Sequence, residues 1–552
     1  MKKKNNILFR TFDRYGLIIL ILYTILFCMI SYYHEPWYDE AQAWQIGKTA
    51  TYLEILTVVT HTEGHPPLWS LLLSVPAKLG VPYLIGLKGV SLFVSLVTIS
   101  LIVFKSPFPK IIKYLLPFTY FLFYQYGVIS RTYCVLELAC ILFAITFNNR
   151  NEKPWRFVGS LFLLCLTSAY GILIAGGICL CWVWEILLDF IQNINMDKLA
   201  RDKRIRSLIV LFILVMVIVY YILPTRNTYA ADRSVFNNFL AKTVYFTLAM
   251  TGDSFISAGG IPLWNSLSAF DLYPGIFSSL AIWSFIFLIS KKKQIKYYIL
   301  PMLFFSVFMI YYGFDHHTGI SFIYVISYTW AVYDKELINK RIDFLAEHIS
   351  KLIRPHKDTL KKAIGLIPLI FIMVSVFYCI ETSVEEIVLP YSETAEVADF
   401  IKNHNLENAI IMIQWDPDLR NMTEEEAEET PDIEKYESES TFDAVPIISY
   451  FDNNIFFNHN IKNHDKGYST HLKLSREENM ETYKLWREYG VPEVLVEECC
   501  LPLVYEGEVS MQDYVHVKTC WGYYMGKQSG ANKRARIYIR KDCLKKFGLD
   551  EM

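Results

Sequence analysis

The sequence contains little charge, and the charge that it has is balanced. Only 20% of its 552 residues are charged, with 53 Lys or Arg against 55 Asp or Glu. Without an excess of positive charge the chain has no general attraction for polyanions, so we expect no nucleic-acid partner. The low charge and the apolar content of 53% together exclude a disordered protein.

The C-terminal third lacks the common nucleotide-binding and redox motifs. Residues 383–552 contain no G-x-G-x-x-G, Walker or C-x-x-C pattern. Their composition is that of a water-soluble α/β domain, with strand candidates at 409–415, 491–498 and 535–540. Nine acids and one Lys in 423–440 indicate a solvated loop. A disulfide among Cys499, Cys500, Cys520 and Cys543 stays open, because the adjacent pair makes the pairing ambiguous.

Residues 1–382, in contrast, are dominated by long apolar runs, and the mean hydropathy of the chain is +0.27. The first run, 15–33, is long enough to cross a hydrocarbon core of about 30 Å as a helix. Basic residues precede it and no small-residue cleavage site follows, so we predict an uncleaved span with a cytoplasmic N-terminus. The composition therefore predicts a multi-pass α-helical protein of the cell membrane, with membrane lipids as neighbours.

Further apolar runs predict about 11–12 spans in all. They lie near 66–80, 83–104, 111–126, 130–147, 156–172, 173–190, 207–223, 265–290, 297–312, 319–334 and 363–381. The loops richest in Lys and Arg, which we place in the cytoplasm, are 105–113, 197–206, 291–296 and 335–362. If the short run 66–80 enters the bilayer without crossing it, eleven crossings put domain 383–552 on the extracytoplasmic side.

This topology gathers ionisable residues on the outer side. They are Glu35, Asp39, Glu40, His61, Glu63 and His65 in loop 34–65, Arg131 after the turn 126–130, Arg226, Asp232, Arg233, Lys242 and Asp253 in loop 224–262, and Asp315, His316 and His317 in the turn 313–318. Solvated loop acids and a snorkelling Arg would explain each of them separately. Two adjacent carboxylates inside an aromatic frame at the depth of the headgroups favour a functional site.

The order of short motifs resembles the multi-pass C-superfamily glycosyltransferases. After the first span come YDEAQAW (38–44) in an outer loop, HPPL (65–68) at the start of the next helix, SRTY (130–133) and GFDHHTG (313–319). The resemblance is to the group that includes the aminoarabinose transferase of lipid A modification and the protein O-mannosyltransferases. It covers roughly residues 15–335, with Asp315 where we expect a basic residue.

The resemblance implies transfer of a sugar from a polyprenyl-phosphate donor to an envelope glycan, lipid or protein at the extracytoplasmic face. Asp39 is the expected general base, with Glu40 as the alternative, in a displacement that inverts the anomeric centre. Arg131, His316 and His317 are expected to bind the donor phosphate, and Lys242 or Arg233 would add positive charge. Glu63, His65, Tyr133 and Trp44 are the expected substrate contacts.

Two questions stay open at this point. No cofactor is certain; a divalent metal is an alternative source of positive charge, and the spacing of His61, Glu63 and His65 suits a loop site without matching an established zinc motif. The alternative function is a multi-pass transporter or flippase for an envelope component. Transporters usually carry their charges near the bilayer midplane, whereas the predicted charges here cluster at the outer surface.

Overall fold

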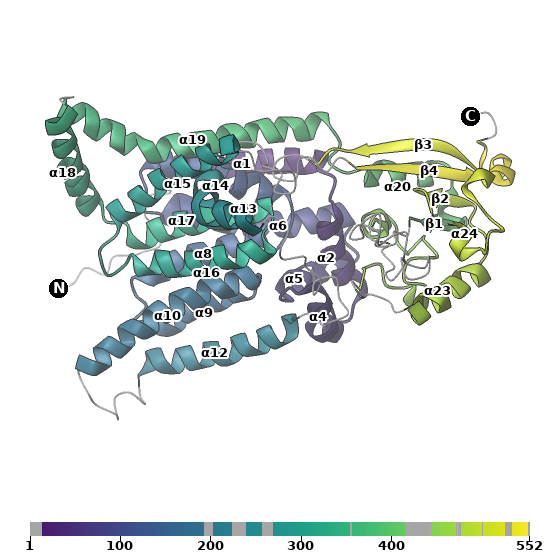
Figure 1. Ribbon diagram of the computed structural model, residues 1–552, viewed down its shortest axis with the longest axis horizontal. Helices are drawn as coiled ribbons and strands as arrows, with labels where there is room; N and C mark the ends of the chain where they lie inside the picture. The colour runs from purple at the N-terminus through teal and green to yellow at the C-terminus, as the bar shows by residue number, and fades with distance from the viewer. Residues whose placement is uncertain are drawn as a thin grey trace.

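A bundle of long helices is joined to a smaller C-terminal part with a β-sheet in the computed structural model (Figure 1). The structure describes residues 14–192, 202–223, 239–256, 269–353, 356–414, 441, 443–470, 472, 476–499, 501–524 and 533–549. Within these residues, six helices are long and apolar enough to cross a membrane. The chain is therefore a helical membrane protein, as its composition predicts.

The helices of the bundle coincide with the apolar runs of the sequence. The six long ones are α1 (Arg14–Tyr33), α6 (Tyr83–Lys105), α10 (Ala169–Gln192), α12 (Lys203–Ile222), α15 (Ala269–Ile289) and α19 (Lys357–Val388). Shorter apolar helices are α5 (Leu68–Lys78), α8 (Tyr133–Phe147), α9 (Pro154–Cys165), α16 (Lys296–Tyr312) and α17 (Gly319–Val332). A helix satisfies its own backbone hydrogen bonds, which is why an apolar run in lipid adopts this form.

Several of the runs do not form a single helix of spanning length. Helices α5, with 11 residues, and α9, with 12, are about 16 and 18 Å long, which is too short for a hydrocarbon core of about 30 Å. The run 111–126 is divided into α7 (Lys110–Leu115) and a π-helical segment, Phe121–Val128. Pro117 lies between them and interrupts the helix, because proline has no N–H to donate.

Part of the predicted outer loop 224–262 is helical. Helix α13 (Phe239–Val244) packs against α16. Helix α14 (Met250–Ile256) packs against α15 and α17. Lys242 and Asp253 are buried there, and the Tyr245 hydroxyl donates to the Asp253 carboxylate at 2.6 Å. The sequence places both residues in an outer loop, whereas the structure places them in helices of the bundle. A hydrogen bond from within the protein replaces the water that Asp253 would otherwise need.

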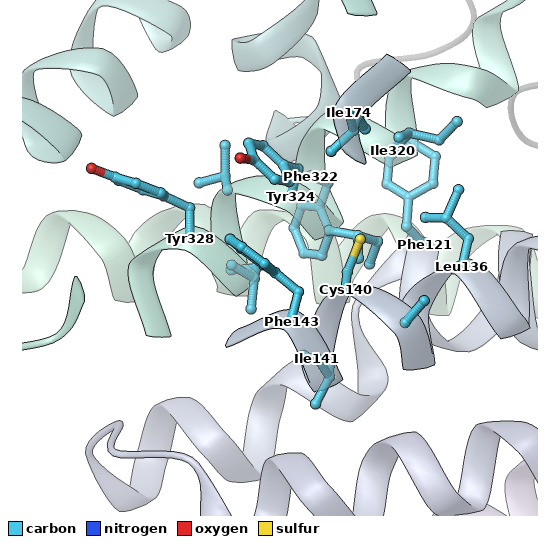
Figure 2. Close-up of a cluster of buried hydrophobic side chains, with 14 of the residues drawn as sticks. Phe121, Leu136, Cys140, Ile141, Phe143, Ile174, Ile320, Phe322, Tyr324 and Tyr328 are labelled. Atoms are coloured by element: carbon cyan, nitrogen blue, oxygen red, sulfur yellow. The ribbon is translucent and has the colours of Figure 1, made fainter. Parts of the chain in front are cut away.

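Helices α8 and α17 form the centre of the bundle. Every residue of α17 is buried, and its aromatic rings pack against those of α8 and of the π-helical segment (Figure 2). The ring centroids of Phe143 and Tyr324 are 6.1 Å apart, and those of Phe121 and Phe322 are 5.9 Å apart. Such contacts fix both helices, so the turns at their ends have a rigid support.

The C-terminal part contains a four-stranded mixed sheet in the order β1-β2-β4-β3. The strands are β1 (Ile411–Ile413), β2 (Val494–Val496), β3 (Tyr514–Gly522) and β4 (Lys533–Arg540), and the helices are α20 (Thr394–Asn403), α22 (Ala444–Ile448), α23 (Arg476–Tyr489) and α24 (Leu501–Val504). Strands β1 and β2 pair in parallel, whereas β4 pairs antiparallel with both β2 and β3. The sequence pattern predicts β1, β2 and β4 but not β3, where a bulge between His516 and Lys518 interrupts the alternation.

Short helices connect the bundle to the C-terminal part. They are α2 (Tyr38–Thr49), α3 (Tyr52–Glu54) and α4 (Thr60–Glu63), and α2 and α4 lie with α5 between the bundle and the sheet (Figure 1). The Gln42 side chain bonds both backbone groups of Ser469, at 2.9 and 2.7 Å. Gln45 donates to the Ser449 hydroxyl at 3.0 Å, and Lys48 donates to two backbone carbonyls. The C-terminal part therefore braces α2.

Several features of the sequence lie outside the described residues. They are the basic residues before Arg14, the candidate cation Arg233, the acidic segment 423–440 and Cys500. Cys499, Cys520 and Cys543 are buried, and the described cysteines form no disulfide with one another.

Candidate active site

Asp39 and Arg131 form an ion pair where the bundle meets the C-terminal part. Asp39 lies in the first turn of α2, where the helix dipole favours a carboxylate. Arg131 lies in the turn before α8, and its Nη2 is 2.6 Å from Oδ2 of Asp39. The Arg131 side chain is 11% exposed and the Asp39 side chain is 33% exposed. The carboxylate is therefore the more accessible partner of the pair.

The guanidinium of Arg131 is enclosed by rings. Its Cζ lies 5.3 Å from the ring centroid of Trp37 and 5.1 Å from that of Tyr133. Its Nη1 donates to Nε2 of His316 at 3.1 Å. Because a guanidinium only donates, His316 must accept at Nε2, which makes it a neutral imidazole with its proton on Nδ1. Burial, followed by the charge of Arg131, holds the pKa of His316 well below its usual value.

His317 belongs to the same turn, Asp315–Thr318. Its Nδ1 accepts the backbone N–H of Phe314 at 3.1 Å and lies 2.9 Å from the Tyr170 hydroxyl. The Tyr126 hydroxyl donates to the carbonyl of His316 at 2.7 Å. The structure thus brings Asp39, Arg131 and the paired histidines together. His316 contacts the arginine, His317 has contacts that hold the turn, and its binding to phosphate stays a prediction.

Two buried hydrogen-bond donors beside Arg131 have no partner among the described residues. They are the indole Nε1 of Trp37 and the hydroxyl of Tyr133. Both belong to the rings that face the guanidinium. Buried polar groups in folded proteins nearly always have a hydrogen-bond partner. An oxygen acceptor bound between these two rings would supply that partner once the side chains move apart, because neither donor is exposed in this structure.

Glu40 occupies a different environment from its neighbour Asp39. It is fully buried, and its oxygens lie 2.8 Å from Nζ of Lys88 and 2.9 Å from Nε2 of His34. The backbone N–H of Ser130 also donates to it, at 2.7 Å. Burial raises the pKa of Glu40, but Lys88 and His34 lower it more, and the result is well below the usual value. We therefore assign Glu40 a structural role in place of the alternative role as a base.

Sequence reasoning missed the rest of this buried network. His34 also contacts Glu386 near the end of α19, with Nδ1 3.1 Å from the carboxylate, and Tyr124 donates to the same carboxylate. Lys88 was a detectable signal, since a lysine in the apolar run 83–104 requires a partner. Glu386 had no comparable signal. The network ties α1, α2, α6 and α19 together directly behind Asp39.

Glu35 adds a titratable group at the edge of this network. Burial raises its pKa to about 8; His34 acts against this, and neighbouring glutamates add to it. The folded state therefore keeps a proton that the unfolded chain releases, so stability falls as the pH rises from about 4.5 to about 8.

Replacing Glu35 with Gln is expected to remove this loss, because glutamine imitates the protonated acid. The variant should melt at a higher temperature than the wild type at about pH 8.5 and at a similar temperature at about pH 4, where the unfolded chain also keeps this proton. Thermal unfolding of the full chain in detergent at the two pH values measures the difference. A gain of equal size at both would contradict the assignment.

Trp44 is a packing residue. It is 2% exposed, its ring centroid is 5.7 Å from that of Tyr83, and a Cβ atom added at Gly86 would lie 2.4 Å from its ring. This corrects the expectation that Trp44 contacts a sugar, because its faces are already covered by protein. The ring frame of the site comes from Trp37 and Tyr133 instead.

Glu63 is the last residue of α4 and His65 follows it by two residues. Glu63 is half-buried and accepts from Gln42 at 2.7 Å, while His65 is exposed. Burial first, and then the carboxylates of Glu63 and Asp39, raise the pKa of the Tyr38 phenol, so both acids act on one side chain. In the described part of the chain no three His, Cys, Asp or Glu side chains gather as a metal site. Metal dependence stays open.

The chain was compared with models of protein families, with curated proteins and with solved structures, and no match was found.

Proposed function

We propose that the chain is a membrane glycosyltransferase of the C-superfamily kind. It moves a sugar from a polyprenyl-phosphate donor to an envelope glycan, lipid or protein. The observation that supports this is the pair Asp39 and Arg131, with His316 and two unpartnered donors around the guanidinium. The Arg131 guanidinium, with two unsatisfied donors in the rings beside it, can bind a phosphate group. The more accessible Asp39 carboxylate next to it can accept a proton from an acceptor hydroxyl or amine.

In this mechanism the donor phosphate takes over Arg131, which frees the Asp39 carboxylate. The Trp37 indole N–H and the Tyr133 hydroxyl donate to oxygens of the donor. Asp39 then accepts the acceptor's proton as its oxygen or nitrogen attacks the anomeric carbon. The bond to the phosphate oxygen breaks, and the lipid phosphate leaves with the electron pair, stabilised by Arg131. A single displacement inverts the anomeric centre.

The proposal includes a topology of eleven crossings with the active site and the C-terminal part outside the cell. Helix length does not decide the number of crossings, because α9, with 12 residues, is hardly longer than α5, with 11. The support comes from the basic loop at 335–362, because α18 (Lys335–Ile353) lies at the end of the molecule away from the sheet (Figure 1). Basic loops favour the cytoplasm, which puts the sheet on the opposite side.

A second candidate is a transporter or flippase. Glu137 in α8 favours it, because this carboxyl is fully buried and has no hydrogen-bond partner among the described residues. Buried acids within the membrane often belong to ion or proton pathways. Transbilayer movement of a labelled lipid-linked sugar in proteoliposomes, without any new glycosidic bond, would favour this function over transfer.

The test of the proposed function is a comparison of cells with and without the gene by mass spectrometry of envelope glycans, lipids and glycopeptides. Transfer predicts that one sugar is lost from one acceptor class while its lipid-linked donor accumulates. A flippase predicts that the donor accumulates on the cytoplasmic side and that all acceptors of that sugar are affected. An unchanged envelope contradicts the proposal.

Replacing Arg131 with Lys is expected to weaken donor use about 10–100-fold, because lysine cannot donate from one plane to a phosphate and His316 while it stacks between two rings. The measurement is the donor concentration that gives half-maximal transfer in isolated membranes. Arg156→Lys, an exposed position on α9, is the matched control. Equal behaviour of the two variants would contradict the role of Arg131.

A further inference from the structure

A groove lies at the end of the bundle away from the C-terminal sheet and from Asp39. It has no part in the proposed transfer. It has a volume of about 310 Å³ and lies between α7, α15, α17, α18 and α19. Its walls are almost entirely apolar and include Ile112, Phe285, Ile342 and Ile372. Helix α18 closes one side and crosses the end of α19 away from the C-terminal sheet (Figure 1). The shape and the lining suit a hydrocarbon chain.

Helix α18 is held in this position by specific contacts. Arg341 donates to the carbonyls of Leu288 and Ser290 at the end of α15, both at 2.7 Å. The same helix directs Ile338 and Ile342 into the groove. Its remaining surface is rich in charge, which is the pattern of a helix that lies at the membrane interface.

Positive charge lies beside the groove on α19. Lys362 is exposed and lies three residues before Gly365 and four before Leu366, so it shares the face of α19 that lines the groove. Lys362 forms no ion pair with another described residue, whereas neighbouring Lys357 and Lys361 do. Residues 335–362 contain eight Lys or Arg against four Asp or Glu. An apolar groove with an unpaired lysine on its rim and a net positive segment around it is complementary to a lipid with a negative headgroup.

We propose that this groove binds an anionic glycerophospholipid, with an acyl chain between α7, α18 and α19 and the phosphate beside Lys362. A neutral lipid would fill the apolar part equally well but would leave Lys362 without an added anion. Selectivity for the negative headgroup is therefore the property that identifies the site. The inference does not depend on the proposed transfer.

Native mass spectrometry of the full chain in detergent, titrated with phosphatidylglycerol or phosphatidylcholine of equal chain length, tests the proposal. Phosphatidylglycerol should bind more tightly, and Lys362→Gln should reduce that preference about fivefold. Two controls should leave the preference unchanged: Lys340→Gln, on the face of α18 opposite the lining residues Ile338 and Ile342, and Lys203→Gln, on α12 outside the groove. Equal binding of the two lipids would overturn the proposal, and so would tighter binding of a polyprenyl phosphate, which would assign the groove to an isoprenoid.

A second variant tests the location of the bound chain. Gly365 lines the groove, and a Cβ atom there would meet nothing within 4 Å, so Gly365→Phe fills the space without a backbone clash. The variant should lose the bound phosphatidylglycerol. Gly159→Phe is the matched control, because Gly159 also has open space but lies on α9 away from the groove. Retention of the lipid by Gly365→Phe to the same extent as by the control would overturn the placement.

Discussion

Replacement of Asp39 by Asn is expected to reduce sugar transfer by about 10²–10⁴-fold, the usual contribution of a general base. Asparagine keeps the shape of the side chain at the start of α2 but cannot accept the proton of the attacking group. Donor binding should be retained, because the lost carboxylate no longer competes with the donor phosphate for Arg131, 2.6 Å away. The measurement is the rate of product formation in isolated membranes at matched protein levels.

The matched control for this variant is Asp399→Asn. Asp399 is an exposed acid on α20 and belongs to none of the contacts around Arg131. It should transfer sugar at the wild-type rate. If Asp39→Asn were equally active, the acid at this position would not be the base and the proposed mechanism would have to be abandoned.

The largest expected effect on stability comes from Lys88. Its ammonium group lies 2.8 Å from Glu40, and both side chains are almost entirely buried. Lys88→Met removes the cation and leaves the carboxylate buried with His34 as its remaining ionisable contact. Breaking a buried pair on one side usually costs about 3–5 kcal/mol of unfolding free energy. Denaturant unfolding of the full chain in mixed micelles measures this loss.

Two further variants test whether the loss of stability comes from the broken ion pair or from the removal of any lysine on α6. Lys105→Met changes an exposed lysine at the end of the same helix and should cost less than about 1 kcal/mol. The double variant Lys88→Met, Glu40→Gln removes both charges and should recover part of the loss, since the uncompensated charge is then gone. A Lys88→Met protein as stable as Lys105→Met would contradict the structural role of the network.

The position of the site could be inferred from the sequence because membrane crossing orders the chain. Asp39 follows a span, Arg131 precedes one and His316 lies between two, so sidedness alone brings them to the same end of the molecule. The ion pair between Asp39 and Arg131, and the contact of Arg131 with His316, agree with that expectation. Their chemical roles remain predictions.

Other assignments could not be made from sequence, because they depend on which direction a side chain points. Asp39 and Glu40 are adjacent, yet the Asp39 side chain is 33% exposed and the Glu40 side chain is fully buried. Successive residues of a helix point about 100° apart, so neighbours face different surroundings. Trp44 belongs to the same short helix and packs onto Tyr83 for the same reason.

The sequence by itself determined that this is a helical membrane protein and where most of its helices begin and end, because apolar length and basic loops act locally along the chain. Only the tertiary structure decided which ionisable residues meet. Lys88 and Glu386 lie far apart in the sequence, and packing brings them to the two ends of one buried chain through Glu40 and His34. Which of these residues come into contact depends on how α1, α6 and α19 cross, and a local sequence pattern does not predict that crossing.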